Sequence, residues 1–214
     1  PKKHAKAKHH ESGLVRWATW GGVFAIMILA PVMFYLLTLA ASAGLLVLST
    51  KTLVGNNVRW TRGLLTLSGT YRALTRSMLT IGSPVFLLLR QEDVVEDQDR
   101  LISILSQVSG AESGALAIFQ KSKTVLGGVL NPYGITVPVG ISDVMTLAVE
   151  VSRVSDYLGL AASQLETLSQ SRRFPFRSSF VSRLTTDALS KLARVRTTVG
   201  YTEKLLTLYP RIAG

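Results

Sequence analysis

The sequence contains no cysteine, and its only histidines are His4, His9 and His10. The lack of cysteine excludes disulfide bonds, thiolate metal sites and cysteine nucleophiles. The lack of histidine after residue 10 excludes a serine–histidine–aspartate triad from the rest of the chain. We interpret the histidines as part of a solvated basic tail rather than a metal site, because Glu11 is the only further ligand nearby.

Acidic residues are also scarce, since 13 Asp and Glu stand against 24 Lys and Arg and give a formal net charge of +11. A chain this basic suits a partner of negative charge, either the anionic surface of a membrane or nucleic acid. The long apolar segment described next favours the membrane. We therefore expect anionic lipid head groups, and no nucleic acid, among the partners.

Charged residues make up only 17% of the chain, and none lies between Trp17 and Thr50. A bilayer span needs ~20 apolar residues in a helix. At ~1.5 Å per residue, a helix over residues 17–50 would reach about 51 Å, well beyond the ~30 Å hydrocarbon core. We expect one long transmembrane helix, kinked at Pro31, whose C-terminal end continues beyond the bilayer core.

Two other interpretations of residues 17–50 stay open. A hairpin of two spans would turn at Pro31, but each half would then be too short for a span. A cleavable signal peptide would end in small residues such as Ala40-Ala41-Ser42-Ala43, but its apolar region is ordinarily ~7–15 residues long. A single span fits the segment better than either.

Basic residues flank this segment on both sides. The first flank is opposed only by Glu11, which predicts a cytoplasmic N-terminus, a single pass through the membrane and an extracytoplasmic helical domain. The second flank weakens this asymmetry, because it contains no acid before Glu92. The first flank consists of Lys2, Lys3, Lys6, Lys8 and Arg16, and the second of Lys51, Arg59, Arg62, Arg72 and Arg76.

Residues 51–90 combine an apolar stripe with arginines at other positions, which is the pattern of an amphipathic helix. If this helix lies at the membrane surface, Arg59, Arg62, Arg72 and Arg76 contact lipid phosphates. If it is instead the first helix of a bundle, the same arginines form a solvated face, and the sequence leaves both open. The stripe consists of Leu64, Leu65, Leu67, Tyr71, Leu74, Met78 and Ile81.

Residues 91–214 are expected to form a helical bundle domain. An acidic run at its start suits a helix N-terminus, and a loop rich in proline and glycine is expected at residues 126–141. Ser142-Asp143 is then expected to cap a further helix. The helix between the acidic run and the loop has an apolar face of Leu101, Leu105, Val108, Ala115 and Phe119.

The last two helices carry apolar stripes at close to 3.5-residue spacing, the pattern of helices packed lengthwise. A turn at residues 171–179 joins them, so they should run antiparallel, and the second should stop at Tyr209-Pro210. The first stripe is Leu147, Val151, Val154, Leu158, Ala161, Leu165 and Leu168, and the second is Val181, Leu184, Ala188, Leu192, Val195 and Val199.

The expected fold class is therefore all-α. An N-terminal transmembrane helix is followed by an antiparallel three- or four-helix bundle or a long helical hairpin. The domain boundaries that follow are a basic cytoplasmic tail at 1–16, a transmembrane helix at 17–50, a basic juxtamembrane helix at 51–90 and the bundle at 91–214.

No motif in the chain indicates catalysis, and we expect no catalytic residue, cofactor or metal. The acidic run lacks the glycine and distal glutamate of an EF-hand, so we interpret it as a solvated helix start. One aromatic cluster is a candidate contact for lipid or a partner, with capping of the bundle core as the alternative. It consists of Phe174 and Phe176 between Arg172, Arg173 and Arg177.

The segment EKLLTLYPRIAG (203–214) resembles part of a family of bacterial membrane proteins, domain-of-unknown-function family 4012. Members have a transmembrane helix, a helical region and a short element of Leu-Pro, one residue, two apolar residues and Gly, where this chain has residues 208–214. The loop NPYGITVPVG (131–140) is loosely similar to a break in that helical region. The resemblance implies a cell-envelope protein whose helices lie outside the cytoplasm, and it supplies no catalytic residues.

Together these features predict a membrane-anchored, non-catalytic scaffold or accessory subunit of a cell-envelope complex. It would bind other membrane-protein subunits, or copies of itself, through apolar helix seams. The alternative is a component of a lipid-handling or transport complex that contacts anionic head groups through its basic helix at 51–90.

Overall fold

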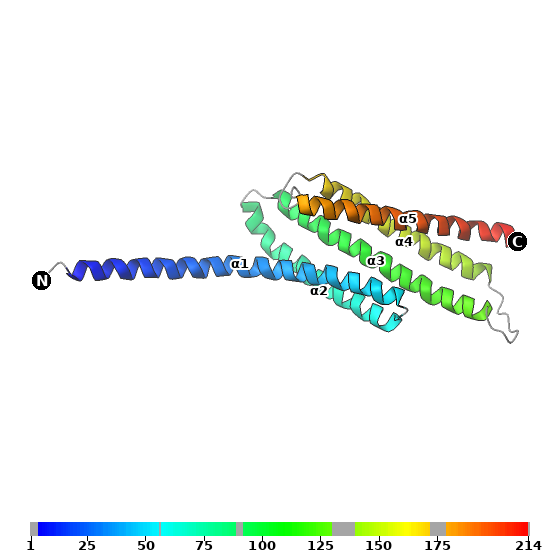
Figure 1. The fold of residues 1–214 in the computed structure, drawn as a ribbon, viewed down its shortest axis with the longest axis horizontal. Helices are drawn as coiled ribbons and strands as arrows, with labels where there is room; N and C mark the ends of the chain where they lie inside the picture. Colours follow the sequence, from blue (N-terminus) through cyan, green and yellow to red (C-terminus); the bar gives the residue numbers. More distant parts are fainter. Residues whose placement is uncertain (1–3, 56, 89–91, 130–139, 172–178, 214) are drawn as a thin grey trace.

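The protein is entirely helical in the part of the chain that the computed structural model describes, which comprises residues 4–55, 57–88, 92–129, 140–171 and 179–213. This confirms the all-α prediction. The five helices of this part pack side by side over much of their length (Figure 1). They are α1 (His4–Val54), α2 (Val58–Leu88), α3 (Glu92–Val129), α4 (Ile141–Ser169) and α5 (Ser179–Ala213).

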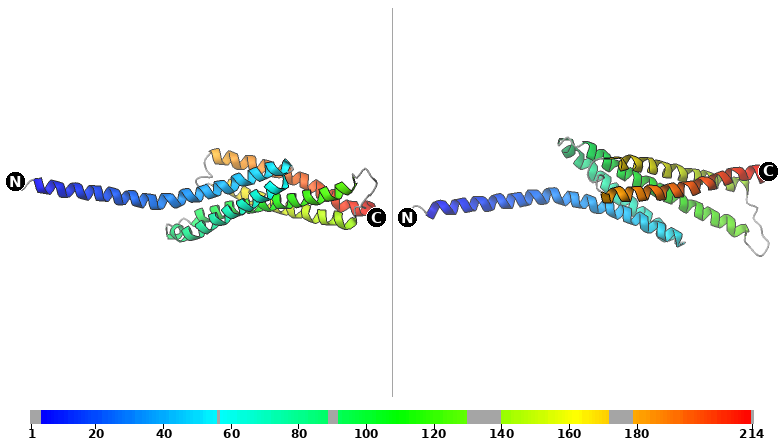
Figure 2. Two further views of the ribbon diagram at one scale, coloured as in Figure 1. Left: turned by 90° about the horizontal axis from the view of Figure 1, so that it is seen from below. Right: turned by 45° about the horizontal axis from the view of Figure 1, so that its top comes forward.

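Helix α1 contains both the basic N-terminal segment and the charge-free segment. It runs through Pro31 without a break, so the hairpin of two spans is wrong. It also includes residues 51–54, which were predicted to belong to the next helix. Its first half projects away from the other helices, whereas its second half packs against α2 and α3 (Figure 1). Figure 2 shows that α1 changes direction about midway along its length.

A tight turn reverses the chain between α1 and α2. The Gly55 amide donates to the Lys51 carbonyl (3.0 Å) and the Asn57 amide donates to the Thr52 carbonyl (2.9 Å). These bonds use carbonyl groups that the end of a helix leaves unpaired. The two helices therefore form an antiparallel hairpin.

The bundle has two distinct ends. At the near end, from which the free half of α1 projects, lie the C-terminal ends of α2 and α4 and the N-terminal ends of α3 and α5 (Figure 1). At the far end lie the C-terminal ends of α3 and α5 and the N-terminal end of α4, and the α1–α2 turn lies well short of that end (Figure 1). We call the place where α1 leaves the bundle the neck.

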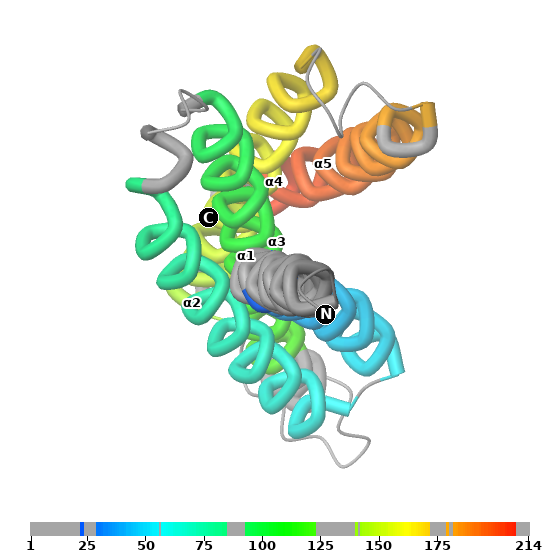
Figure 3. Tube along the Cα trace, turned by 90° about the vertical axis from the view of Figure 1, so that its left-hand side faces the viewer, coloured from blue at the N-terminus to red at the C-terminus, as the bar shows by residue number. Residues whose placement is uncertain are grey.

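Helix α3 is the centre of the bundle. It contacts α1 and α2 on one side and α4 on the other, whereas α5 lies against α4 (Figure 3). A helix with neighbours on several sides buries more than one face. The buried residues of α3 accordingly include Ile102, Ile104, Ala111 and Leu116, none of which belongs to the single apolar face predicted for it.

Two glycines allow α3 and α4 to approach closely. A Cβ at Gly114 would lie 2.5 Å from Cγ2 of Val154, and one at Gly110 would lie 2.9 Å from the Tyr157 ring. Both distances are far below van der Waals contact, so a larger residue at either position would require the Val154 or Tyr157 side chain to move. Their four-residue spacing puts both on the same face of α3.

The apolar repeat of α4 forms the main core, as predicted. Its residues from Val151 to Leu168 are buried at every position of the predicted stripe, and Leu147 is half-buried. They pack against Ile104 of α3 and against Leu189 and Leu192 of α5. The heptad spacing therefore identified a real seam, as expected for helices packed lengthwise.

The seam predicted for α5 is wrong at two positions. Leu184 and Val195 are exposed, whereas Thr185 is buried and Leu189 is half-buried. A helix that packs on one neighbour buries only a narrow face, and the face of α5 is rotated from the most apolar stripe. The leucine-rich side of α5 is consequently left on the surface.

Three predicted helix boundaries also require correction. Helix α3 continues through the glycines at 127–128 to Val129, so the first part of the predicted loop is helical; residues 130–139 lie outside the described part. Helix α4 begins at Ile141 with Gly140 as its N-cap, and Asp143 accepts a bond from the Gly140 amide (3.2 Å). Helix α5 continues through Pro210 to Ala213.

Candidate interaction site

The interface between α1 and α2 is lined by hydroxyl groups rather than by leucines. The Ser42 and Ser68 side chains are each 0% exposed. The Ser42 hydroxyl donates to the Ser68 carbonyl (3.2 Å), and the Ser68 hydroxyl donates to the Ser42 carbonyl (3.0 Å). Further along, Thr75 donates to the Thr38 hydroxyl (3.0 Å). We call this row, which also includes Ser49 and Thr61, the hydroxyl seam.

Helix α2 buries its hydroxyl-bearing face and exposes most of the apolar stripe that was predicted to be buried. Leu67, Tyr71, Leu74 and Ile81, which were predicted to share the apolar stripe of α2, are exposed, and only Leu64 and Leu65 of that stripe are buried. Helix α1 likewise exposes large apolar side chains in its packed half, such as Val47 and Leu48. Small residues at a helix interface allow the two backbones to approach closely.

The sequence contains a signal for this seam. Thr61, Ser68 and Thr75 are seven residues apart, which places them on one face of a helix packed along another. A search limited to apolar periodicity misses them, because serine and threonine are ordinarily read as surface residues. Interhelical hydrogen bonds satisfy their hydroxyls here, so their burial carries little penalty.

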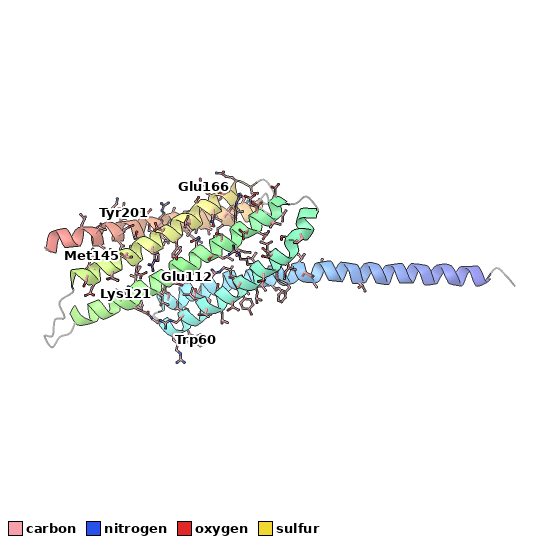
Figure 4. The ribbon with its side chains drawn as sticks, turned by 180° about the vertical axis from the view of Figure 1, so that it is seen from behind. Trp60, Glu112, Lys121, Met145, Glu166 and Tyr201 are labelled. Carbon is pink, nitrogen blue, oxygen red and sulfur yellow. The ribbon has the colours of Figure 1, made fainter. Side chains whose placement is uncertain are left out.

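A carboxylate of α3 forms hydrogen bonds with the α1–α2 hairpin and connects it to the rest of the bundle. Glu112 accepts hydrogen bonds from the Ser49 hydroxyl and from Thr50 Oγ1 (2.7 Å to the latter). It lies midway along α3, where that helix faces α1 (Figure 4). Burial raises the pKa of Glu112 above its ordinary value, although the two hydroxyl donors act in the opposite direction.

Arg72 forms a second connection between α2 and α3. Its guanidinium donates to the Leu105 carbonyl (2.7 Å) and to the Ser109 hydroxyl (3.3 Å). Burial lowers its pKa, but an arginine remains charged at neutral pH. This candidate lipid contact is therefore engaged within the protein.

The other candidate arginines of α2 lie at opposite ends of the helix. Arg59 and Arg62 are exposed in its first turns, beside the α1–α2 turn. Arg76 is exposed towards the near end, with Nη2 3.8 Å from Oδ1 of Asp99 on α3. The structure thus does not bring the four arginines together on one surface.

The cluster Arg172, Arg173, Phe174, Phe176 and Arg177 lies outside the described residues. The described residue before it, Ser171, donates to Oδ2 of Asp97 (3.2 Å), which attaches the end of α4 to the start of α3. The chain therefore leaves α4 at the near end of the bundle.

The acidic run at the start of α3 pairs with arginines. Arg100 contacts Glu96 (2.5 Å) and Asp97 (3.6 Å), and Arg76 contacts Asp99. Three acids of the run, Glu96, Asp97 and Asp99, are thus paired with arginines. Over the described residues, no group of three histidine, cysteine or acidic side chains is placed to hold a metal ion.

An apolar patch lies exposed near the C-terminal end of α5. We call Tyr201, Leu205 and Leu208 the α5 patch; Leu205 is 70% exposed. Arg194 and Lys204 lie near it on the same helix, as does Glu203. Exposed large apolar residues that cluster on one helix face mark candidate protein contacts.

Two stretches are long and apolar enough to cross a membrane, as judged by length and composition over the described residues. They are Leu29–Val54 of α1 and Asp93–Ser122 of α3. The second lies in the centre of the bundle and is packed by three other helices, which is how the core helix of a soluble domain also passes such a test. The first includes part of the helix that projects alone.

Comparison with known proteins yields no relative. No protein-family model, no curated protein and no solved structure matches the chain. The resemblance of residues 203–214 to family 4012 thus gains no support from these comparisons, and the function is argued from the chain itself.

Proposed function

We propose that this protein is a membrane-anchored, non-catalytic scaffold or accessory subunit of a cell-envelope complex. The observation that carries the proposal is the division of α1 into a half that projects alone and a half that packs in the bundle. The charge-free residues 17–37 begin in the free half, and their last turns, from Pro31 on, lie beside the ends of α2 and α3. A helix of that length reaches about 31 Å, which matches the hydrocarbon core.

In this arrangement residues 17–37 cross the bilayer once, and the near end of the bundle faces the membrane. The remainder of α1 continues out of the bilayer as the first helix of the bundle. The basic residues before the span favour a cytoplasmic N-terminus and an extracytoplasmic bundle, as in the organisation that the resemblance to family 4012 implies.

The α5 patch is the proposed binding surface for another subunit. Helix α5 carries six Lys and Arg against two Asp and Glu, so the matching partner is a helix with an apolar stripe and acidic flanks. Helix α5 packs on α4 alone among the described helices, which leaves its outward side open to a further helix. Association with a second copy of this chain is the competing outcome, and cross-linking distinguishes the two.

The geometry favours this scaffold over lipid handling by the basic residues of α2. With the span at the near end, Arg59 and Arg62 lie at the opposite end of α2, away from the head groups. Arg72 is held by α3, and only Arg76 remains at membrane level. A single arginine supplies little of the charge that surface binding needs.

Extraction of membranes at alkaline pH tests the anchor. We expect the full chain to stay in the membrane pellet and the double variant Leu29→Arg, Met33→Arg to be released, because a charge within a span is costly, up to about 2.5–3.5 kcal/mol at its centre. The matched control is Val47→Arg, Leu48→Arg, which changes equally exposed residues of the packed half. Release of the control together with the test variant would count against the assigned span.

A further inference from the structure

An apolar cavity lies at the neck, between the three helices that meet there. It has a volume of about 340 Å³. Helix α1 supplies one wall, the end of α2 a second and the start of α3 a third. The lining residues are Pro31, Val32, Tyr35, Leu36, Met78, Leu79, Ile81, Gly82, Val94, Val95 and Gln98.

The polar groups of this cavity are engaged with each other. The Tyr35 hydroxyl donates to Oε1 of Gln98 at 2.7 Å, and the other lining side chains are aliphatic apart from Met78, with Gly82 contributing none. A polar ligand would therefore lose its hydration without gaining matching hydrogen bonds. An apolar ligand has no hydrogen bonds with water to lose, and it buries apolar surface in the cavity.

The cavity is continuous with the apolar surface of the free half of α1. Val32 and Leu36 line it and are also exposed, and Leu29, Met33 and Leu37 beside them are exposed as well. If residues 17–37 cross the bilayer, these side chains lie in the last turns of the span. Lipid tails of the adjacent leaflet then reach the mouth of the cavity directly.

A cation stands where the head group of such a lipid would lie. Arg76 precedes Met78 on α2 and is farther from the span than the cavity. Its pair with Asp99 is long at 3.8 Å, and both side chains are more than half exposed. An exposed pair of this kind is weak, so the guanidinium can turn to a phosphate at little cost.

We infer that the neck cavity binds one acyl chain of a phospholipid from the leaflet next to the bundle, with Arg76 beside its phosphate. This site rests on the proposed membrane anchor and adds a specific lipid to it. The bound chain fills a cavity between α1, α2 and α3, and thereby fixes the angle at which the bundle stands on its span.

Photo-crosslinking with a synthetic lipid tests this site. The full chain is reconstituted in vesicles of phosphatidylcholine and phosphatidylglycerol containing phosphatidylglycerol with a diazirine in its acyl chain, and the adducts are mapped by mass spectrometry. We expect adducts on Leu79 and Val95 as well as on α1. Leu79 is only 8% exposed and lines the cavity, so an adduct there reports a tail inside the cavity.

A filled cavity provides the matched variant. Val95→Trp should lower the adducts on α2 and α3 by roughly fivefold or more, because a large side chain occupies the space of the tail. Leu67→Trp, on the exposed face of α2, should leave them unchanged. Val95→Ala enlarges the cavity without overpacking and should retain the adducts, which keeps the test valid if the tryptophan variant does not fold.

The outcomes separate the lipid site from the anchor. Adducts confined to exposed residues of α1, or unchanged by Val95→Trp in a folded protein, overturn the lipid site and leave the anchor standing. A chain that does not float with the vesicles overturns the anchor, and the lipid site falls with it.

Discussion

Ser42 and Ser68 form a reciprocal pair across the α1–α2 interface, in which each hydroxyl donates to the backbone carbonyl of the other residue. A pair of this kind requires the two helix backbones to approach closely, because a serine side chain is short. Larger residues would push the helices apart and break both bonds.

Substitution of Ser68 tests this close approach. Ser68→Leu should destabilise the protein by about 1–3 kcal/mol through overpacking, and Ser68→Ala by about 1 kcal/mol through the lost hydrogen bonds. The measurement is thermal unfolding followed by circular dichroism. Thr66→Leu is the control, because Thr66 is exposed and bonds only the Arg62 carbonyl of its own helix. If Ser68→Leu and Thr66→Leu lower the melting temperature equally little, the interface is not tightly packed.

Glu112 should make stability depend on pH. Burial raises its pKa above the ordinary value of 4.5, so the folded state holds this proton more tightly than the unfolded chain does. The contribution of Glu112 to stability is therefore fully present below pH 4.5 and is lost as pH rises through the raised pKa.

The variant Glu112→Gln isolates this effect. Its melting temperature should fall less than that of the wild type as pH rises from 4 towards 7, because the amide does not ionise. Glu166→Gln serves as the control, since Glu166 is exposed on α4. Parallel profiles for wild type and Glu112→Gln would contradict the raised pKa of Glu112.

Arg72 and Arg76 lie one helical turn apart, yet they should respond differently to the same change. Arg72→Met loses a charged donor to the Leu105 carbonyl and should cost about 1–2 kcal/mol, with the loss limited by partial exposure. Arg76→Met removes only an exposed ion pair and should cost below about 0.5 kcal/mol. Chemical unfolding compares them, and equal losses would contradict the connection of α2 to α3 through Arg72.

The α5 patch should be required for partner binding but not for folding. Leu205→Asp should abolish cross-links to a partner subunit in intact membranes, because a charge enters an apolar contact. Its melting temperature should stay within experimental error, since Leu205 is 70% exposed. Ser190→Asp, also exposed on α5, is the matched control. Unchanged cross-linking of the Leu205→Asp variant would contradict the assignment of the α5 patch as the binding surface.

The parts of the fold that follow from local pattern could be predicted from the sequence. The heptads of α4 are an example, because every position from Val151 to Leu168 in the predicted stripe is buried. The all-α class also follows from pattern, since both observations depend on the period of a single helix.

The features of the fold that depend on which neighbours a helix packs against could not be predicted from the sequence. Whether Leu74 or Thr75 of α2 faces inward is decided by α1, which offers the Thr38 hydroxyl to Thr75. Leu184 of α5 is exposed because α5 packs on α4 alone among the described helices. The aromatic cluster at residues 172–177 lies outside the described part, so the structure leaves its predicted role as it was.

Only part of the candidate site could be predicted from the sequence. The sequence indicated that α1 is too long for a simple span, and the structure places its second half in the bundle. The neck cavity could not be predicted from the sequence, because its walls come from residues near 32, 79 and 95, on three different helices. No spacing in the chain relates these three positions to one another.

The most direct test of the membrane anchor uses the absence of cysteine. Met33→Cys and Val47→Cys give single thiols at positions of α1 that are 51% and 60% exposed, so burial in the protein does not distinguish them. In intact membranes, a water-soluble maleimide should label position 47 and leave position 33 unmodified. Equal labelling of both thiols would contradict the assignment of residues 17–37 to the bilayer.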